Sequence, residues 1–294
     1  MILERFVTMS TIAMRSPNNQ NRRPAFTLVE MLVTVSIIVV LVALLLPVVR
    51  KVAQAGSATR ELNLARQLMV GFASYTQDNR GVLLPGYYDK VPSLPAHDQY
   101  GHALGAEESH RYLWRLAPYL DYNVETLFLD PTLVEALRAT NQFEYFLSLY
   151  TPLGMNTMFI GGDSRPEGLG FNAQFQQIYG DFYLTRMSQA KRPAELITFG
   201  SARCSAPYTP QAPPVIEGFH RIESPYLFNR RWSTDWDPTN TPKLWGYLSM
   251  RDSDRQAAIG YLDGHAGYLD DGQIQDMRRW VDQADTPNWT LEPQ

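Results

Sequence analysis

The stretch that most constrains this chain is an apolar run of 24 residues, from Phe26 to Val49, in which Glu30 is the only formally charged side chain. A helix rises about 1.5 Å per residue, so this run would reach about 36 Å, whereas the hydrocarbon core of a bilayer is about 30 Å thick. The run therefore predicts one membrane-spanning helix near the N-terminus.

Glu30 is unfavourable in such a segment unless something compensates for its charge. An acid at the centre of a membrane helix costs about 2.5 to 3.5 kcal/mol, and less near an interface. Arg22 and Arg23 stand just before the run, which predicts that the N-terminus stays in the cytoplasm. An ordinary secretory signal has a shorter apolar stretch, and a plain signal anchor gives no reason for Glu30.

The residues Ala25-Phe26-Thr27-Leu28-Val29-Glu30 resemble the class III signal of type IV pilins and type II secretion pseudopilins. The resemblance implies that a prepilin peptidase cuts between Ala25 and Phe26 and that the amine of Phe26 is methylated. It also implies that Glu30 pairs with the N-terminus of a neighbouring subunit. Ala25 replaces the glycine that is most common in the family, a change expected to slow cleavage. Pro47, the twenty-second residue counted from Phe26, matches a helix-kinking proline of many pilins.

These landmarks divide the chain into a leader, a long helix and a globular domain. Residues 1–25 form the cytoplasmic leader, and residues 26–80 form the helix, with a membrane part at about 26–49 and an amphipathic part at about 50–77. Residues 81–294 form a periplasmic globular domain that is long enough to bury a core. The expected fold class is α+β, a pilin-like arrangement of a long N-terminal helix and an antiparallel sheet.

Within the globular domain, residues 111–122 and 133–139 are predicted to be helical. Short runs bounded by glycine, proline, asparagine or aspartate predict strands, and the last two should form a hairpin around Asp263-Gly264. Residues 205–214 are rich in proline and predict a surface loop. The predicted strands are residues 145–150, 158–160, 196–199, 226–228, 244–250, 257–262 and 266–269.

The sequence Asp263-Gly264-His265 resembles an element near the C-terminus of many bacterial prepilin-type proteins. Their usual pattern has a histidine ten residues before the aspartate, where this chain has Ser253. The residues themselves predict a turn, in which Asp263 bonds nearby amides, Gly264 takes a positive φ and His265 opens the next strand.

A metal site at this turn is the alternative interpretation. A carboxylate and an imidazole two residues apart can share a cation with other acids, and a structural calcium ion is the candidate. The spacing lacks the regularity of an EF-hand loop, so the leading expectation is that the chain has no cofactor. The acids that could join Asp263 and His265 are Asp252, Asp254, Asp270 and Asp271.

Composition bears on the remaining functions. The leader has four arginines and one glutamate, so the formal charge of -4 falls to about -7 in the processed chain, and no nucleic-acid partner is expected. Cys204 is the only cysteine, so no intrachain disulfide can form. We expect Cys204 to be a small buried side chain, and the alternative is a catalytic thiol.

The aromatic, histidine and glycine residues are expected to have mainly structural roles. The tryptophans are expected mainly in the core, with a carbohydrate or partner surface as the alternative. Most histidines outside the Asp-Gly-His element should be exposed or locally hydrogen-bonded, and the glycines near residues 161–163 and 168–170 should form turns. The residues concerned include Trp232, Trp236, Trp245, Trp280, Trp289, His97, His102, His110 and His220.

The leading hypothesis is a non-enzymatic pilin-like subunit, or pseudopilin, with no catalytic residues. It would sit in the bacterial inner membrane with its globular domain in the periplasm, and would join a periplasmic or surface fibre of other pilin-like subunits. The alternative is a membrane-tethered periplasmic ligand-binding protein or hydrolase that uses the same segment only as an anchor. That alternative would place Asp263, His265 and Asp252 in its site.

Overall fold

The long N-terminal helix is the first element of the fold. A computed structural model describes residues 27–89, 96–205, 215–233, 235–250 and 255–294. Helix α1 (Leu28–Asp78) has 51 residues and ends one residue after the predicted amphipathic part. The chain divides into two compact units after Lys51, and each unit contains one part of α1.

The globular unit, from Val52 onward, is built around a five-stranded sheet in the order β5-β1-β2-β6-β7. Strand β1 pairs parallel with β5, and the other pairs are antiparallel, so the sheet is mixed where the sequence predicted an antiparallel one. The α+β class is confirmed. The strands are β1 (Leu153–Asn156), β2 (Ile197–Ser201), β5 (Arg221–Ile222), β6 (Gln256–Tyr261) and β7 (Ala266–Asp270), with β3 (Cys204–Ser205) and β4 (Val215–Ile216) in a separate pair.

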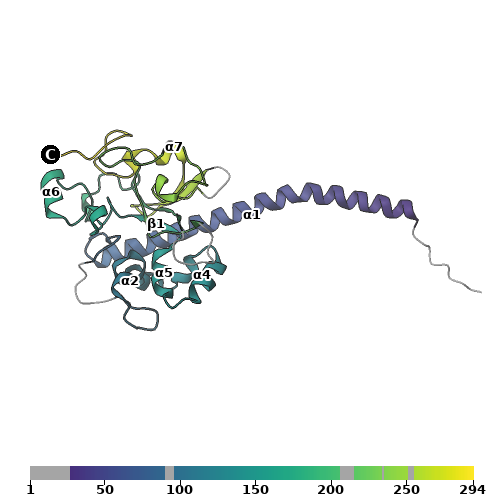
Figure 1. Ribbon diagram of the computed structural model, residues 1–294, viewed down its shortest axis with the longest axis horizontal. Coiled ribbons are helices and arrows are strands. Elements are labelled where there is room, and N and C mark those ends of the chain that lie inside the picture. Colours follow the sequence, from purple (N-terminus) through teal and green to yellow (C-terminus); the bar gives the residue numbers. More distant parts are fainter. Residues whose placement is uncertain (1–26, 90–95, 206–214, 234, 251–254) are drawn as a thin grey trace, which may run out of the picture. The chain divides into compact units, whose positions relative to one another are not determined.

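Short helices complete this unit. Figure 1 shows α2, α4 and α5 on one side of the second part of α1, and α6 and α7 on the other. The α-helices of the described residues after α1 are α2 (Ala106–His110), α3 (Tyr112–Leu116), α4 (Pro131–Arg138), α5 (Phe143–Leu149), α6 (Ala173–Tyr179) and α7 (Asp271–Ile274). The short 3₁₀ turns include η1 (Ala117–Leu120), η3 (Pro166–Gly168) and η5 (Pro242–Trp245).

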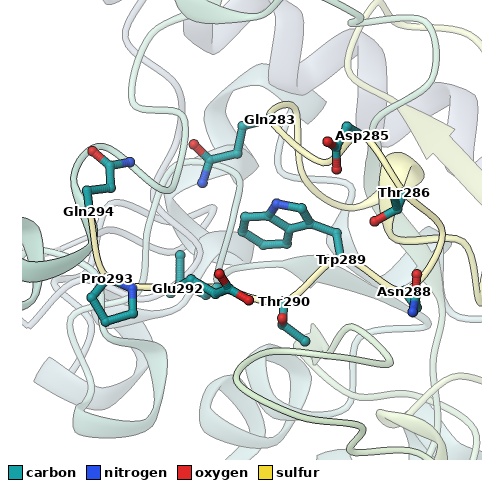
Figure 2. A pocket seen from close by; sticks show the side chains of 10 residues that line it. Gln283, Asp285, Thr286, Asn288, Trp289, Thr290, Glu292, Pro293 and Gln294 are labelled. Atoms are coloured by element: carbon teal, nitrogen blue, oxygen red, sulfur yellow. The ribbon is translucent and has the colours of Figure 1, made fainter.

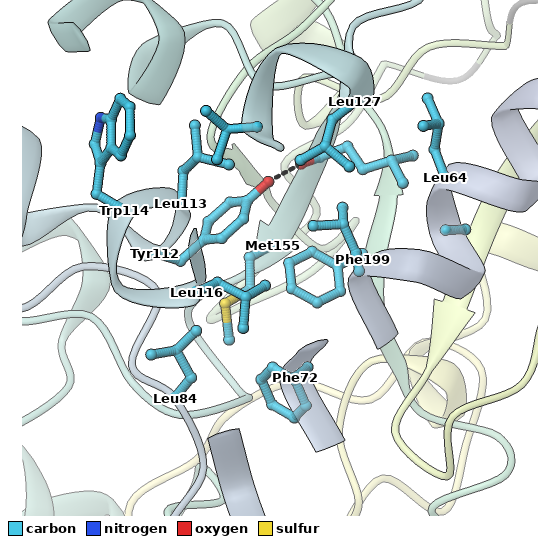
Figure 3. Packing of buried hydrophobic residues seen from close by; sticks show 14 of the residues in the cluster. Leu64, Phe72, Leu84, Tyr112, Leu113, Trp114, Leu116, Leu127, Met155 and Phe199 are labelled. Carbon is cyan, nitrogen blue, oxygen red and sulfur yellow. Dashed lines mark hydrogen bonds between the residues drawn. The ribbon is translucent and has the colours of Figure 1, made fainter. Parts of the chain in front are cut away.

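The second part of α1 packs on one face of the sheet. A Cβ atom at Gly260 of β6 would lie 2.7 Å from Cγ of Met69, so the glycine allows a close approach of helix and strand. The Phe72 and Phe199 rings meet edge to face with centroids 5.8 Å apart. Figure 3 shows these rings beside Tyr112, whose hydroxyl donates to the carbonyl of Leu153 in β1. The helix is therefore part of the core of this unit.

The core has two clusters, one on each face of the sheet, and a bulge in β2 makes that strand contribute to both. The register against β6 shifts between Ile197 and Phe199, which places an extra residue in β2. Without that shift, residues two apart would share a face, but Phe199 belongs to the cluster on α1 and Ile197 to the cluster on the opposite face. The second cluster contains Trp232, Trp245 and Trp280, as expected for core tryptophans, whereas Trp236 and Trp289 are only partly buried.

Several predicted strands are wrong. Residues 145–150 lie mostly in α5, because their aromatic residues pack at helical spacing, and residues 244–250 begin in η5 after Pro242. Residues 158–160 and 226–228 make only isolated bridges. Strands β2, β6 and β7 confirm the other three predictions. The helix predicted at residues 111–122 is divided into α3 and η1, with Pro118 in the 3₁₀ turn.

Two further sequence features have clear outcomes. The helix predicted at residues 133–139 is α4, which starts two residues earlier because the side chain of Asp130 caps it by accepting from the Thr132 amide at 2.9 Å. Cys204 is buried, and burial, with the charge of Glu217, raises the pKa of its thiol to about 12. The thiol therefore stays protonated at neutral pH. Residues 206–214 of the predicted loop lie outside the described residues.

The packing of α1 predicts a large difference between two neighbouring helix positions. Phe72→Ala should lower the free energy of unfolding by about 3 to 5 kcal/mol, because it leaves a cavity against Phe199. Val70→Ala, at a side chain that is 64% exposed, should change it by less than about 0.5 kcal/mol. Urea unfolding of the full-length protein in detergent, followed by tryptophan fluorescence, measures both. Equal effects of the two substitutions would contradict this packing.

Candidate functional site

The N-terminal unit presents a carboxylate at the first turn of an apolar helix. The amide of Thr27 donates to Oε2 of Glu30 at 2.9 Å, and the Thr27 hydroxyl donates to the same oxygen at 2.8 Å. In return, the Glu30 amide donates to Oγ1 of Thr27 at 3.2 Å. These reciprocal bonds form a capping box, which satisfies amides that the start of a helix leaves without partners.

The capping box also has a signal in the sequence. A threonine followed three residues later by a glutamate, just before an apolar run, is the usual pattern, and Thr27-Leu28-Val29-Glu30 fits it. Glu30 therefore has a local structural role in addition to its charge. Ala25 and Phe26, the predicted cleavage and methylation residues, lie outside the described residues.

The side chains that follow Glu30 suit an apolar surrounding. From Leu28 to Leu46, and again at Val49, the large apolar side chains are exposed. Among the described residues this is the one helix long and apolar enough to cross a membrane, over Leu28–Pro47. The hydroxyls of Thr34 and Ser36 donate to carbonyls one turn earlier, at 2.7 and 2.8 Å, so these polar groups need no water.

Pro47 lies inside this helix, as predicted. Because proline has no amide hydrogen, the carbonyl four residues earlier, at Ala43, lacks its usual helical donor. Such a position is a natural site for a bend or a local change of helix geometry.

The C-terminal element is the exposed turn between β6 and β7. Gly264 has a φ of +101°, and its amide donates to the carbonyl of Tyr261 at 2.8 Å. Oδ1 of Asp263 accepts from the His265 amide at 3.1 Å and lies 2.6 Å from Nδ1 of the same residue. The His265 ring stacks on Tyr261 with centroids 4.1 Å apart. This is the turn that the sequence predicted.

The turn is fastened to the rest of the globular unit by its backbone. The Leu262 amide donates to the carbonyl of Leu196 at 3.0 Å, and the Asp263 amide donates to that of Pro193 at 3.2 Å. The side chains of Asp263 and His265 remain 33% and 49% exposed. Their geometry therefore serves the turn and does not create an enclosed site.

The acids considered for a metal site have other partners where they are described. Asp270 caps α7 by accepting from the Gln273 amide at 2.7 Å, and Asp271 pairs with Arg255 at 2.7 Å. Asp252 and Asp254 lie outside the described residues. Within the described ranges, no three histidine, cysteine or acidic side chains gather in a way that could hold a metal ion.

A buried polar cluster around His220 was not predicted. Most histidines outside the Asp-Gly-His element were expected to be exposed or locally hydrogen-bonded, whereas His220 is 3% exposed and its Nε2 lies 3.0 Å from Nη1 of Arg165, a residue distant in sequence. Arg165 also pairs with the buried Asp163, which accepts from the Thr157 hydroxyl at 2.8 Å. Sequence reasoning missed the cluster because His220 lies 55 positions from Arg165 in the chain.

The turn predicted at residues 168–170 encloses Asp163. A Cβ atom at Gly168 would lie 2.3 Å from Cβ of Asp163, so only glycine fits there. Burial raises the pKa of Asp163, but the hydrogen bonds and charge of Arg165, with the Thr157 hydroxyl, outweigh it and hold that pKa below its usual value. The buried carboxylate therefore stays charged and holds the loop together.

Comparison with known proteins identifies the N-terminal segment. Residues 20–46 match the family model described as the prokaryotic N-terminal methylation motif. Comparisons with curated proteins and with solved structures gave no significant match. The motif and the single apolar helix fit a prepilin-type, membrane-anchored protein. The motif implies processing by a prepilin peptidase and assembly with other pilin subunits, and it suggests a structural subunit rather than an enzyme.

The hairpin turn predicts that alanine substitutions at two of its glycines have different effects on stability. Both positions have room for a Cβ atom, since nothing lies within 4 Å at Gly264 and only Tyr261, at 3.8 Å, at Gly267. Gly264→Ala should lower the free energy of unfolding by about 1 to 2 kcal/mol, because alanine is strained at positive φ. Gly267→Ala should be neutral or stabilising. Denaturant unfolding compares the two, and an equally tolerated Gly264→Ala would contradict the turn.

His220 predicts a loss of stability in mild acid. Burial lowers its pKa well below 6.5, and the nearby charges of Arg165, Arg111 and Arg221 lower it further. The unfolded chain therefore binds more protons below about pH 6.5, and stability falls as the pH decreases. Between about pH 7.5 and pH 5.5 this group should remove about 1 kcal/mol. His220→Gln should unfold with a correspondingly weaker pH dependence, and an unchanged dependence would contradict a neutral buried imidazole.

Proposed function

We propose that this chain is a non-enzymatic pilin-like subunit, or pseudopilin. A prepilin peptidase processes it, and it then assembles through its N-terminal helix into a type II secretion or type IV pilus-like fibre. One observation carries the proposal: a carboxylate held at the first turn of an exposed apolar helix, inside a matched methylation motif. The peptidase cleaves between Ala25 and Phe26, and the new amine of Phe26 is methylated.

The new amine compensates the charge of Glu30 in a neighbouring subunit. The Oε2 atom of Glu30 accepts both bonds from Thr27, and its Oε1 atom makes no hydrogen bond with the described residues. One oxygen thus fixes the side chain while the other is available to an incoming ammonium group. Pairing of this kind offsets the desolvation penalty that an isolated carboxylate would bear in a low-dielectric surrounding.

The proposed topology follows from charge. Arg22 and Arg23 precede the apolar helix, which favours a cytoplasmic leader and a globular domain in the periplasm. The subunit then belongs to the bacterial inner membrane before assembly, and other pilin-like subunits are its partners. The exposed apolar side chains from Leu28 to Leu46 supply the packing surface, first for lipid and then for neighbouring helices.

The hydrolase alternative loses its main support at the hairpin. It required Asp263 and His265 to converge with other acids in a pocket, whereas both side chains are partly exposed on a turn and bond to each other. The assembly proposal accounts for Glu30, which the hydrolase alternative does not.

Two substitutions separate the charge of Glu30 from its capping role. Glu30→Gln keeps a side chain that suits a capping box but removes the charge, so it should reduce incorporation into fibres at least about tenfold. Thr27→Val removes the capping hydroxyl, at about 1 kcal/mol of helix stability, but keeps the carboxylate, and should stay within about twofold of the unmodified protein. Immunoblots of sheared fibres and membranes measure incorporation.

Processing is checked in the same samples by the mass of the N-terminal peptide, so that failed cleavage is not mistaken for failed assembly. Normal incorporation of a correctly processed Glu30→Gln protein would contradict charge pairing. A defect confined to Thr27→Val would instead assign the role to the helix cap.

A further inference from the structure

A concave site lies on the globular unit where the C-terminal segment folds back. Its volume is about 520 Å³, within the range of about 300 to 1,000 Å³ that is usual for small-ligand sites. Figure 2 shows the Trp289 indole at its centre, with Gln283 and Asp285 in the upper part of the view, Gln294 to the left and Glu292 below the ring. The site is separate from the hairpin and from the N-terminal helix segment discussed above.

The segment that forms the site is fixed at several points. The Leu291 amide donates to the carbonyl of Leu227 at 2.7 Å, and the Leu291 side chain is buried. The Gln294 amide donates to the carbonyl of Ile178 at 2.8 Å. Gly180 leaves room for the Gln294 side chain, since a Cβ atom there would lie 2.3 Å from Oε1 of that residue. A ligand would therefore meet a preformed surface, which reduces the entropy lost on binding.

Trp289 differs from the tryptophans of the core. The indole N–H groups of four others donate to backbone carbonyls, and Arg203 lies over the ring of Trp236 at 4.0 Å. The indole of Trp289 makes no hydrogen bond, ring stacking or cation contact within the described part of the chain. Its ring is only partly buried, so part of it is accessible to a ligand. An indole placed in this way offers an apolar face and a free donor. The four tryptophans with bonded indoles are Trp114, Trp232, Trp245 and Trp280.

The side chains around Trp289 also have unused hydrogen-bonding capacity. Gln283, Asp285, Asn288 and Glu292 line the site and make no side-chain hydrogen bond or ion pair with the described residues. Amides supply donors and acceptors, and carboxylates accept from hydroxyl groups. The lining contains two carboxylates and no lysine or arginine, so it disfavours anionic ligands.

We propose that this site binds a neutral oligosaccharide, with one sugar ring lying on the indole of Trp289 and its hydroxyl groups bonded to the surrounding amides and carboxylates. A pyranose has an apolar face of C–H groups and an edge of hydroxyls, which matches an aromatic platform ringed by polar side chains. The site would let the globular domain recognise a neutral glycan whether or not the chain assembles into a fibre.

Binding is tested on the full-length protein in a detergent without a sugar headgroup. Cellohexaose, chitohexaose, maltohexaose and xylohexaose are titrated separately to about 1 mM, a range suited to weak sites, by calorimetry and tryptophan fluorescence. At least one should bind, and Trp289→Ala should weaken that binding at least about tenfold. Tyr100→Ala, which removes an aromatic side chain that is 76% exposed elsewhere, should leave binding within about twofold.

Two additional variants keep the test independent of folding. Gln283→Ala and Asp285→Ala alter exposed polar side chains, and each should weaken binding about threefold without changing the unfolding midpoint. The proposal is overturned if none of the four sugars binds, if Trp289→Ala and Tyr100→Ala bind equally well, or if oligolysine binds at this site in their place.

Discussion

Glu30 places one charge at the beginning of an apolar helix, and the properties of the N-terminal segment are organised around that charge. In the single chain, Thr27 bonds one carboxylate oxygen through its amide and its hydroxyl, which also completes the helix cap. The hydroxyls of Thr34 and Ser36 are satisfied within the helix, so Glu30 is the polar group whose charge still needs a partner in an apolar surrounding. The matched methylation motif connects that need to a processed N-terminal amine.

The two parts of helix α1 differ in which side chains they expose, and they therefore have different roles. From Leu28 to Leu46 the large apolar side chains are exposed, as suits a surface that contacts lipid or other helices. From Leu64 to Phe72, in contrast, one stripe is buried against the sheet, where Gly260 and Phe199 receive Met69 and Phe72. Removal of this second stripe would expose the core of the globular unit, so that unit depends on the helix for its own stability.

Sequence reasoning succeeded where one local pattern dominates and failed where tertiary contacts decide. The apolar run, the Asp263-Gly264 turn and the flanking strands were predicted because hydrophobicity and glycine chemistry act locally. Residues 145–150 were misassigned as a strand because a short aromatic run fits either period, and the structure shows α5. Strand β1, Leu-Gly-Met-Asn, has weak strand propensity and is held by its neighbours on both sides. The burial of His220 depends on Arg165, 55 positions away, which no local pattern reveals.

The most direct test is the mass of the N-terminal peptide of the protein extracted from its native membrane. The account predicts a mature chain that begins at Phe26 and carries one additional methyl group on its amine, because only a freed N-terminus can supply the partner for Glu30. A chain that retains residues 1–25, or one that begins elsewhere with an unmodified amine, would contradict the account and leave the apolar helix as a simple anchor.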